Sequence, residues 1–202
     1  MSKVTDGTGT NYEAKVDANK QLHVFALTEN EQNSALEGGN LFNINTGLIA
    51  LTGTSDSACL YIKNDEAPVN GESALIISSI IIGLFDRSAT ITDAAIATII
   101  RNPTTGTIID DASSITMKSN SNFGSSNGLS SLCYKATGTG KTFTDGDDHA
   151  IVLLGDGRTP IPELNIDLPK GSSIGVNIDL NTSGGANVYI AVVAYRKDGK
   201  NE

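Results

Sequence analysis

The sequence is poor in the residue types that most enzymes use for chemistry. Its 202 residues include two His, two Cys and no Trp, and only 18% of them are charged. Histidine is the commonest general acid or base in catalysis, and cysteine is among the strongest protein nucleophiles. We therefore expect a protein that is not an enzyme, with no catalytic residue, no cofactor and no bound metal.

Positive charge is also scarce. The chain has 14 Lys and Arg residues against 23 Asp and Glu residues, a formal net charge of −9. Binding to DNA or RNA depends on basic side chains that displace phosphate counterions, so no nucleic-acid partner is expected. Anionic membrane surfaces are disfavoured for the same reason. The longest apolar run, residues 74–85, is too short to span a bilayer, and the N-terminus has no signal-peptide pattern. We expect synthesis in a cytoplasm and no membrane partner.

Small polar residues and β-branched residues dominate instead. Gly, Thr, Ser and Asn together make up 78 of the 202 residues, a composition typical of an all-β protein with many turns. Short apolar or alternating segments recur between turn signals roughly every 8–12 residues, which is the spacing of a β-sandwich or barrel. We predict strands at residues 21–27, 41–51 (two strands around Asn45-Thr46-Gly47), 57–64, 74–85, 93–100, 107–109, 113–117, 132–136, 150–154, 163–168, 173–180 and 187–195.

The strand pattern favours one jelly-roll-like β-sandwich over residues 20–202, with about eight core strands and some extra ones. Residues 1–19 are polar and rich in Gly and Thr, and they predict an extended N-terminal arm. Residues 29–39 suit either a short helix or a loop. Residues 119–131 and 138–148 predict polar loops, and residues 169–171 predict a tight connection between two strands.

Three short segments resemble functional motifs but lack their essential features. Residues 138–142 match the end of a phosphate-binding P-loop, but Lys135 occupies the position of the first glycine and no helix pattern follows. We predict a hairpin loop there. Residues 145–148 carry three carboxylates without EF-hand spacing, which predicts a solvated acidic turn, with a surface Ca²⁺ site as the alternative. Asp110-Asp111 is a weaker pair of the same kind.

The histidines and cysteines stand apart from any catalytic pattern. His23 lies in the first predicted strand, and His149 adjoins the acidic turn, where it can form a protonation-sensitive contact. The letters G-x-S-x-G occur at residues 124–128 and 171–175, but neither segment shows the strand–turn–helix pattern that holds the nucleophile elbow of a catalytic triad. Cys59 and Cys133 are isolated in sequence, so we predict two buried free thiols on strands, with a disulfide as the alternative.

Aromatic residues make up 5% of the chain. Tyr61, Tyr189 and Tyr195 lie in apolar strands, where packing in the core or in an interface is expected. A sugar-binding site of the lectin type usually exposes Trp or Tyr platforms, which the sequence does not provide.

Several stretches together resemble virion structural proteins of tailed bacteriophages, particularly those of marine phages. The stretches are AKVDANKQLHV (residues 14–24), FNINTGLIALTGTSDSACLYIKNDE (42–66), IRNPTTGTII (100–109), SNSNFGSS (119–126) and LPKGSSIGV (168–176). The resemblance runs from about residue 14 to residue 195. It concerns the composition of these segments and their order along the chain rather than a catalytic motif. It implies an abundant structural component of the particle, either a decoration or cement protein of the capsid or a part of the neck or tail fibre. Jelly-roll trimers are the recurring form of such cement proteins.

The resulting expectation is a capsid decoration or cement protein. We expect a homotrimer, made in the host cytoplasm, that binds the major capsid protein on the outer surface of a phage head and stabilises it. Apolar strands at residues 76–84 and 188–195 are expected in the core or in trimer contacts, and the loops and the arm in capsid contacts. The alternative is a neck, fibre or spike component with a β-sandwich module that binds host glycan, recognisable by an exposed aromatic or carboxylate cluster in its loops. A β-sandwich hydrolase or lyase is the least favoured alternative.

Overall fold

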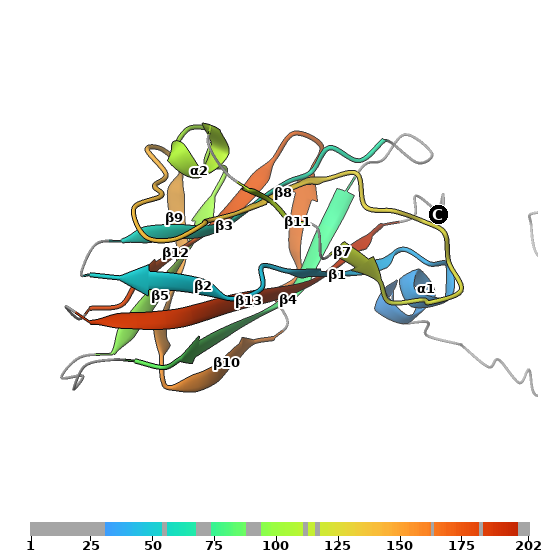
Figure 1. Ribbon diagram of the computed structural model, residues 1–202. Helices are drawn as coiled ribbons and strands as arrows, with labels where there is room; N and C mark the ends of the chain where they lie inside the picture. Colours follow the sequence, from blue (N-terminus) through green and yellow to red (C-terminus); the bar gives the residue numbers. More distant parts are fainter. Residues whose placement is uncertain are drawn as a thin grey trace, which may run out of the picture. The chain divides into compact units, whose positions relative to one another are not determined.

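Figure 1 shows the computed structural model of the protein, which describes residues 31–53, 56–67, 74–87, 94–110, 113–115, 118–162, 164–181 and 184–197. Within these residues two antiparallel sheets enclose an apolar core, which makes the protein an all-β sandwich. Two short helices, α1 (Glu31–Glu37) and α2 (Thr107–Asp110), accompany the described strands. The predicted arm (residues 1–19), the predicted strand at residues 21–27 and His23 lie outside the described residues.

The first sheet contains seven of the described strands. Along the sheet run β10 (Gly157–Ile161), β4 (Ala74–Phe85), β13 (Gly185–Arg196), β1 (Leu41–Asn45) and β7 (Lys118–Asn120), while β11 (Ile166–Pro169) also pairs with β4 and β2 (Ile49–Thr52) also pairs with β13. The second sheet runs in the order β6 (Ser113–Ser114), β8 (Leu132–Lys135), β3 (Ser57–Lys63), β12 (Ser173–Asp179), β5 (Ala95–Arg101) and β9 (Asp147–Leu154).

Strands from the first part of the chain pair with strands from the last part, in nested order, as in one long β-hairpin that is folded into two sheets. The early strands β1 and β2 pair with the last strand, β13, and β3 pairs with β12. Inside this nest, β4 pairs with β10 and β11, and β5 pairs with β9. Nested pairing of early with late strands is the arrangement of a jelly roll, so the predicted fold class is confirmed.

A β-bulge at Ser78 sets which side chains of β4 enter the core. The ladder between β4 and β13 pairs Val193 with Ser79 and Ala194 with Ile77, and so skips Ser78. An extra residue reverses the alternation of a strand. The buried side chains therefore change from odd to even positions along the strand: Leu75 and Ile77, then Ile80, Ile82 and Leu84. This re-phasing explains why the run at residues 74–85 is apolar at consecutive positions.

Three elements differ from the sequence prediction. Strand β7 includes residues 119 and 120, which were predicted as the start of a polar loop. The strand predicted at residues 107–109 is wrong, because this segment forms the single helical turn α2, in which Gly106 O accepts hydrogen bonds from the amides of Ile109 and Asp110. The turn buries Ile108 against Ala58 and Tyr61 on the outside of β3. Strand β10 was not predicted from its sequence, GRTPI. Its proline is tolerated because β10 lies at the edge of the sheet.

The other predicted strands are present with shifted ends. The predictions at residues 41–51, 57–64, 74–85, 93–100, 132–136, 150–154, 173–180 and 187–195 correspond to β1 with β2, β3, β4, β5, β8, β9, β12 and β13. The segment predicted at residues 163–168 begins pairing only at Ile166, and the one at residues 113–117 pairs at Ser113–Ser114. The ambiguous residues 29–39 include the helix α1.

Candidate functional site

The P-loop-like segment is a loop, but the predicted hairpin is wrong, because the flanking strands β8 and β9 are not neighbours in their sheet. Residues 138–142 lie between β8 and β9, and no helix follows Lys141. Instead, Lys141 O accepts a hydrogen bond from the amide of Ala58 (2.8 Å), and the Thr142 amide donates to Thr107 Oγ1 (2.8 Å). The segment therefore covers the outside of β3 and has no helix N-terminus to offer a phosphate.

The acidic turn is anchored through Asp145. Its carboxylate accepts hydrogen bonds from the amides of Thr104 (2.8 Å) and Thr105 (2.9 Å) and from the Thr104 hydroxyl. These bonds favour the charged form and lower the pKa of Asp145 to about 2, led by the Thr104 hydroxyl bond. The carboxylate thus stabilises a neighbouring turn.

The described residues contain no group of three or more His, Cys, Asp or Glu side chains arranged to hold a metal ion. Asp147, Asp148 and His149 follow one another along β9 with exposed side chains. Asp110 ends α2 with an exposed side chain, and Asp111 lies outside the described residues.

Both cysteines are buried free thiols on strands, as predicted. Cys59 on β3 and Cys133 on β8 form no disulfide. Burial raises the pKa of each thiol to about 12. Tyr61 and Tyr195 are also buried, whereas Tyr189 is half-buried and its ring stacks on that of Phe85 at a centroid distance of 5.7 Å.

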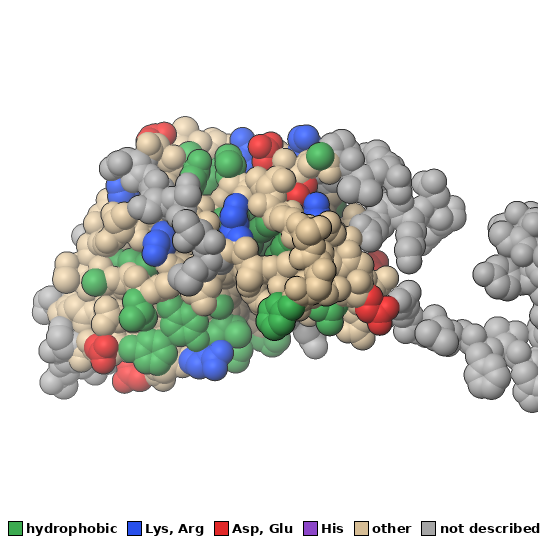
Figure 2. Space-filling model, turned by 45° about the vertical axis from the view of Figure 1, so that its right-hand side comes forward, with side chains coloured by type: hydrophobic (Ala, Val, Ile, Leu, Met, Phe, Trp, Pro, Cys, Tyr) green, Lys and Arg blue, Asp and Glu red, His purple; other side chains and the backbone are tan. Residues whose placement is uncertain are grey.

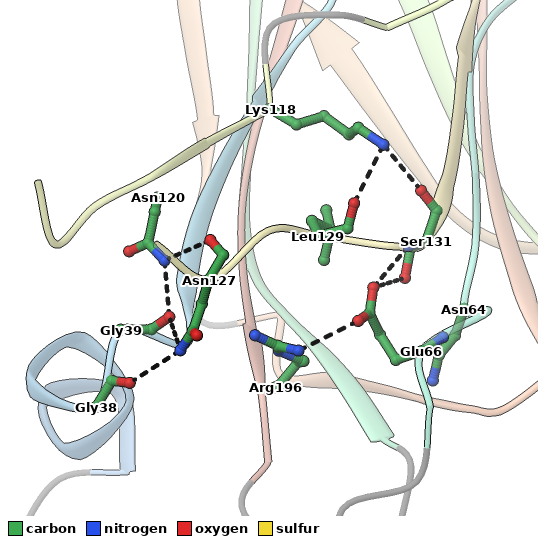
Figure 3. Close-up of polar contacts among 10 residues, drawn as sticks. All are labelled: Gly38, Gly39, Asn64, Glu66, Lys118, Asn120, Asn127, Leu129, Ser131 and Arg196. Atoms are coloured by element: carbon green, nitrogen blue, oxygen red, sulfur yellow. Dashed lines mark hydrogen bonds and ion pairs between the residues drawn. The ribbon is translucent and has the colours of Figure 1, made fainter. Parts of the chain in front are cut away.

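The polar loop between β7 and β8, residues 121–131, is fastened at both ends (Figure 3). At one end, Asn120 Nδ2 donates to Gly39 O (2.7 Å), and Asn127 Nδ2 donates to Gly38 O (3.4 Å) and Gly39 O (3.2 Å). Asn120 Nδ2 also donates to Asn127 O (3.1 Å) across the loop. The two amides thus occupy carbonyls that follow the C-terminal end of α1, where a helix leaves its acceptors unused.

At the other end a buried carboxylate holds Ser131. Glu66 is 2% exposed, and its Oε1 accepts hydrogen bonds from the Ser131 amide (2.6 Å) and hydroxyl (2.9 Å). Arg196 Nη1 lies 3.5 Å from Glu66 Oε2, and the guanidinium sits 5.1 Å above the Phe42 ring centroid. Lys118 Nζ donates to Leu129 O and Ser131 O, both at 3.3 Å. We call these contacts and the Asn120–Asn127 contacts the loop clamp.

The clamped loop exposes one aromatic side chain almost completely. Phe123 is 97% exposed. Its neighbour Asn122 is held in place, because its Nδ2 donates to Glu37 O (3.2 Å) and its Oδ1 accepts from the Gly124 amide (3.0 Å). The phenyl ring therefore stands on a backbone that is hydrogen-bonded on both sides.

A cleft of about 330 Å³ opens at the other edge of the sandwich. It lies where β11 of the first sheet faces β5, β9 and β12 of the second, and Ile99, Ile166, Leu168 and Ile174 line it. Polar lining comes from several side chains: Arg101, Asn102, His149, Asp167, Ser172 and Ser173. A mainly apolar cleft with a few polar groups at its border is the usual form of a binding pocket.

The outer face of the first sheet is apolar as well. Outward positions of β2, β4 and β13 carry apolar side chains that are exposed or half-buried: Ala50, Ile81, Phe85, Tyr189, Ala191 and Val193, with Leu48 beside them at 66% exposure. Figure 2 shows hydrophobic side chains gathered along the lower part of the molecule, where β4, β10 and β13 lie in Figure 1. One end of this face is covered by α1, which packs Ala35 against Leu41, Ile76 and Tyr195. We call the remaining residues the outer apolar face.

Sequence reasoning missed the loop clamp, the cleft and the outer apolar face. Phe123 offers one local signal, because it is a single large apolar residue within the polar segment SNSNFGSS. Glu66 and Arg196 offer none, since they are 130 residues apart in the chain. The outer apolar face was included in the apolar strands, but the sequence did not separate it from the core.

A search against protein-family models and against curated protein sequences finds no match to the chain. No helix within the described residues has the length and hydrophobicity needed to cross a membrane.

Proposed function

We propose that the protein is a structural component of a phage particle, a decoration or cement protein that binds the outer surface of the head as a homotrimer. Its partners are further copies of itself and the major capsid protein, and its location is the virion surface after synthesis in the host cytoplasm. The resemblance of residues 14–195 to virion structural proteins and the jelly-roll sandwich support this proposal. It requires no enzymatic activity and no cofactor.

The outer apolar face carries the proposal. Soluble monomers rarely expose a contiguous apolar patch of more than a few hundred Å², and larger patches mark interaction sites. Three neighbouring strands, about 4.8 Å apart and each contributing about five residues of 3.3 Å, cover roughly 240 Å² in projection. The face lies on a sheet, whose backbone is held by ladder hydrogen bonds, so it suits a rigid protein surface such as a capsid shell.

Binding to a shell needs little affinity per contact. A symmetric lattice offers many equivalent sites, and linked copies reinforce one another because the second contact forms at a high effective concentration. The acidic character of the chain keeps it soluble and away from packaged nucleic acid. A trimer that uses one outer apolar face per copy would therefore hold a capsid with modest individual contacts.

Two measurements test the proposal. Light scattering on the purified chain should give a mass near three times 21.0 kDa. Sedimentation with emptied heads of the phage that encodes the chain should carry the protein down in a fixed ratio to the major capsid protein. Absence of co-sedimentation at micromolar concentrations would contradict the proposed function.

A matched pair of variants locates the contact. Ala191→Glu places a charge in the middle of the outer apolar face, and Thr137→Glu places the same charge at an exposed position on the β8–β9 connection. We expect Ala191→Glu to abolish co-sedimentation and Thr137→Glu to leave it unchanged. Equal behaviour of the two variants would show that the face is not used.

Phe123 favours a second candidate function, the glycan-binding module of a neck, fibre or spike component. The exposed ring between Asn122 and Gly124 is a single aromatic surface rather than the expected cluster, and it offers one face on which a sugar could stack. Stacking of a sugar on Phe123 would give binding on a glycan array that disappears in Phe123→Ala. Retention of array binding by that variant, or no array binding by the wild type, would remove this candidate.

A further inference from the structure

A trimer needs two different surfaces on every copy. In a three-fold ring each copy contacts its neighbours through two unlike patches, whereas a patch that meets itself gives a two-fold dimer. The outer apolar face is a single patch, so it does not by itself provide the two halves of a three-fold contact. The sequence-based expectation that strand faces form the trimer contact therefore needs another pair of surfaces.

Such a pair lies on opposite edges of the sandwich. The loop of residues 121–131 joins β7 to β8, and β7 and the β8–β6 pair stand at one end of their sheets. The cleft is lined by β11 and by β5 and β9, which stand at the other end. One edge thus carries a projecting phenyl ring and the opposite edge carries an apolar hollow.

The sizes of the two features match. An apolar cavity of about 150 Å³ is large enough to bind benzene, and the cleft measures about 330 Å³. A phenyl ring therefore fits with room for part of its loop. Contact with the half-buried Ile166, which lines the cleft, would replace part of the water that now surrounds the ring.

We propose that Phe123 of one copy inserts into the cleft of the next copy, so that three copies close into a ring. This inference rests on the proposed homotrimer and assigns its contact. The occupant of the cleft is a second copy of this chain rather than a small molecule.

Charge supports the same orientation. Glu37 is an exposed acidic residue next to the Phe123 loop, since its carbonyl accepts from Asn122. Arg101 lines the cleft, is exposed, and forms no ion pair with any described residue. Asp167 and His149 also line the cleft, and Asp167 is the one acidic side chain among the described lining residues. Insertion of Phe123 would bring Glu37 of one copy toward Arg101 of the next.

The area explains why the contact needs a closed ring. An aromatic side chain buries about 150–250 Å², whereas a stable interface buries about 800 Å² on each partner. Phe123 is therefore an anchor within a small contact, and one contact alone gives weak association. When the third copy closes the ring, the third contact forms without a further loss of translational and rotational freedom. Trimers should therefore form without a populated dimer.

The test uses two variants that break opposite halves of the contact. Phe123→Ala removes the ring, and Ser172→Phe fills the cleft from within, since Ser172 lines it and is half-buried. Truncation of an aromatic anchor typically weakens a contact by about 30-fold or more. By light scattering we expect a trimer for the wild type and monomers for both variants. Leu48→Ala, which trims an exposed side chain beside the outer apolar face, should remain trimeric.

Mixing the two monomeric variants gives the sharpest result. The intact cleft of Phe123→Ala can accept the intact ring of Ser172→Phe, but the new pair has no second contact to extend. The mixture should therefore form no trimers, and it should form dimers only at concentrations well above those at which the wild type is trimeric, because a single contact holds each dimer. Circular dichroism and thermal melting of Phe123→Ala should match the wild type, because the side chain is exposed.

The outcomes separate this inference from the proposed function. A wild-type trimer that persists in Phe123→Ala and Ser172→Phe overturns the inference and leaves the capsid proposal standing. A monomeric wild type that still sediments with phage heads also overturns the inference. Failure of the trimeric wild type to bind heads overturns the capsid proposal while the ring contact stands.

Discussion

Replacement of Glu66 by alanine should release the clamped loop and destabilise the whole sandwich. The carboxylate joins three segments that are distant in sequence: the connection after β3, the end of the loop at Ser131, and the end of β13 at Arg196. It is 2% exposed, and the guanidinium of Arg196 is largely buried as well. Water therefore cannot replace the lost carboxylate without opening the structure.

The expected cost follows from these contacts. A hydrogen bond to a charged group contributes about 1.5–3 kcal/mol, and removal of one partner of a buried ion pair costs about 3–5 kcal/mol. The 3.5 Å separation of Arg196 from Glu66 makes that pair the weaker part, whereas the 2.6 Å bond from the Ser131 amide is short. We expect Glu66→Ala to lower the free energy of unfolding by about 3–5 kcal/mol. Ser131→Ala, which removes only the hydroxyl bond to this carboxylate, should cost about 1.5–3 kcal/mol.

Urea unfolding followed by far-ultraviolet circular dichroism measures both values. Asp65→Ala is the matched control, because Asp65 precedes Glu66 on the same connection and its carboxylate is exposed. Its effect should stay within about 0.5 kcal/mol. A loss of less than about 1 kcal/mol in Glu66→Ala would refute the claim that this carboxylate fastens the loop.

Three further perturbations have defined outcomes. The pKa of Asp145 is lowered to about 2, so its charged carboxylate stabilises the folded protein above about pH 4, and this stabilisation is lost as the pH falls toward 2. In calorimetry, the melting temperature of Asp145→Asn should therefore lie below that of the wild type at pH 5 and converge with it near pH 2. Unequal melting temperatures at pH 2 would contradict this assignment. Cys59 and Cys133 should not react with a thiol-specific disulfide reagent at pH 8 until urea unfolds the chain, because burial raises both pKa values to about 12; rapid labelling of the native protein would show that the strands open. Gly83→Ala should cost about 1–3 kcal/mol, because its Cβ would overlap the Tyr189 ring, and less in a Tyr189→Ala background. An equal cost in both backgrounds, measured by urea unfolding, would exclude the ring as the cause.

The local sequence pattern was enough to predict most of the strands, but it did not predict which strands pair with one another. The segments that became β1 to β5 and β12 to β13 have apolar side chains at strand spacing and turn residues at their ends, such as Gly47 with φ +66°. Strand order depends on pairing between distant segments, for example Ala74 with Pro169, which one sequence does not encode locally. Helix α2 replaced a predicted strand because tertiary packing of Ile108 outweighed the strand propensity of its neighbours.

The candidate site was harder to predict for the same reason. The cleft is made from four strands of two sheets: β5, β11 and β12 contribute ordinary apolar residues, and β9 contributes His149. The acidic turn drew attention through its carboxylates, yet Asp145 serves the turn at Thr104 and Thr105. Phe123 lies within one of the segments that resemble virion structural proteins. That resemblance does not tell whether its ring points outward, because the direction of a side chain in a polar loop depends on distant contacts such as that of Asn120 with Gly39.

The composition of residues 119–131 would suit a flexible linker, since Ser, Asn and Gly lower the barriers to chain motion. Here the asparagines have the opposite effect, because their amides bond to carbonyls after α1 and within the loop itself. A loop that is already ordered loses little freedom when it binds, so more of the contact energy of Phe123 is available for association. The prediction that follows is specific. Asn120→Ala should weaken trimer formation although Asn120 lies outside the proposed contact, and adding Asn120→Ala to Phe123→Ala should cause no further loss. Additive losses in light scattering would mean that Asn120 and Phe123 act through separate contacts.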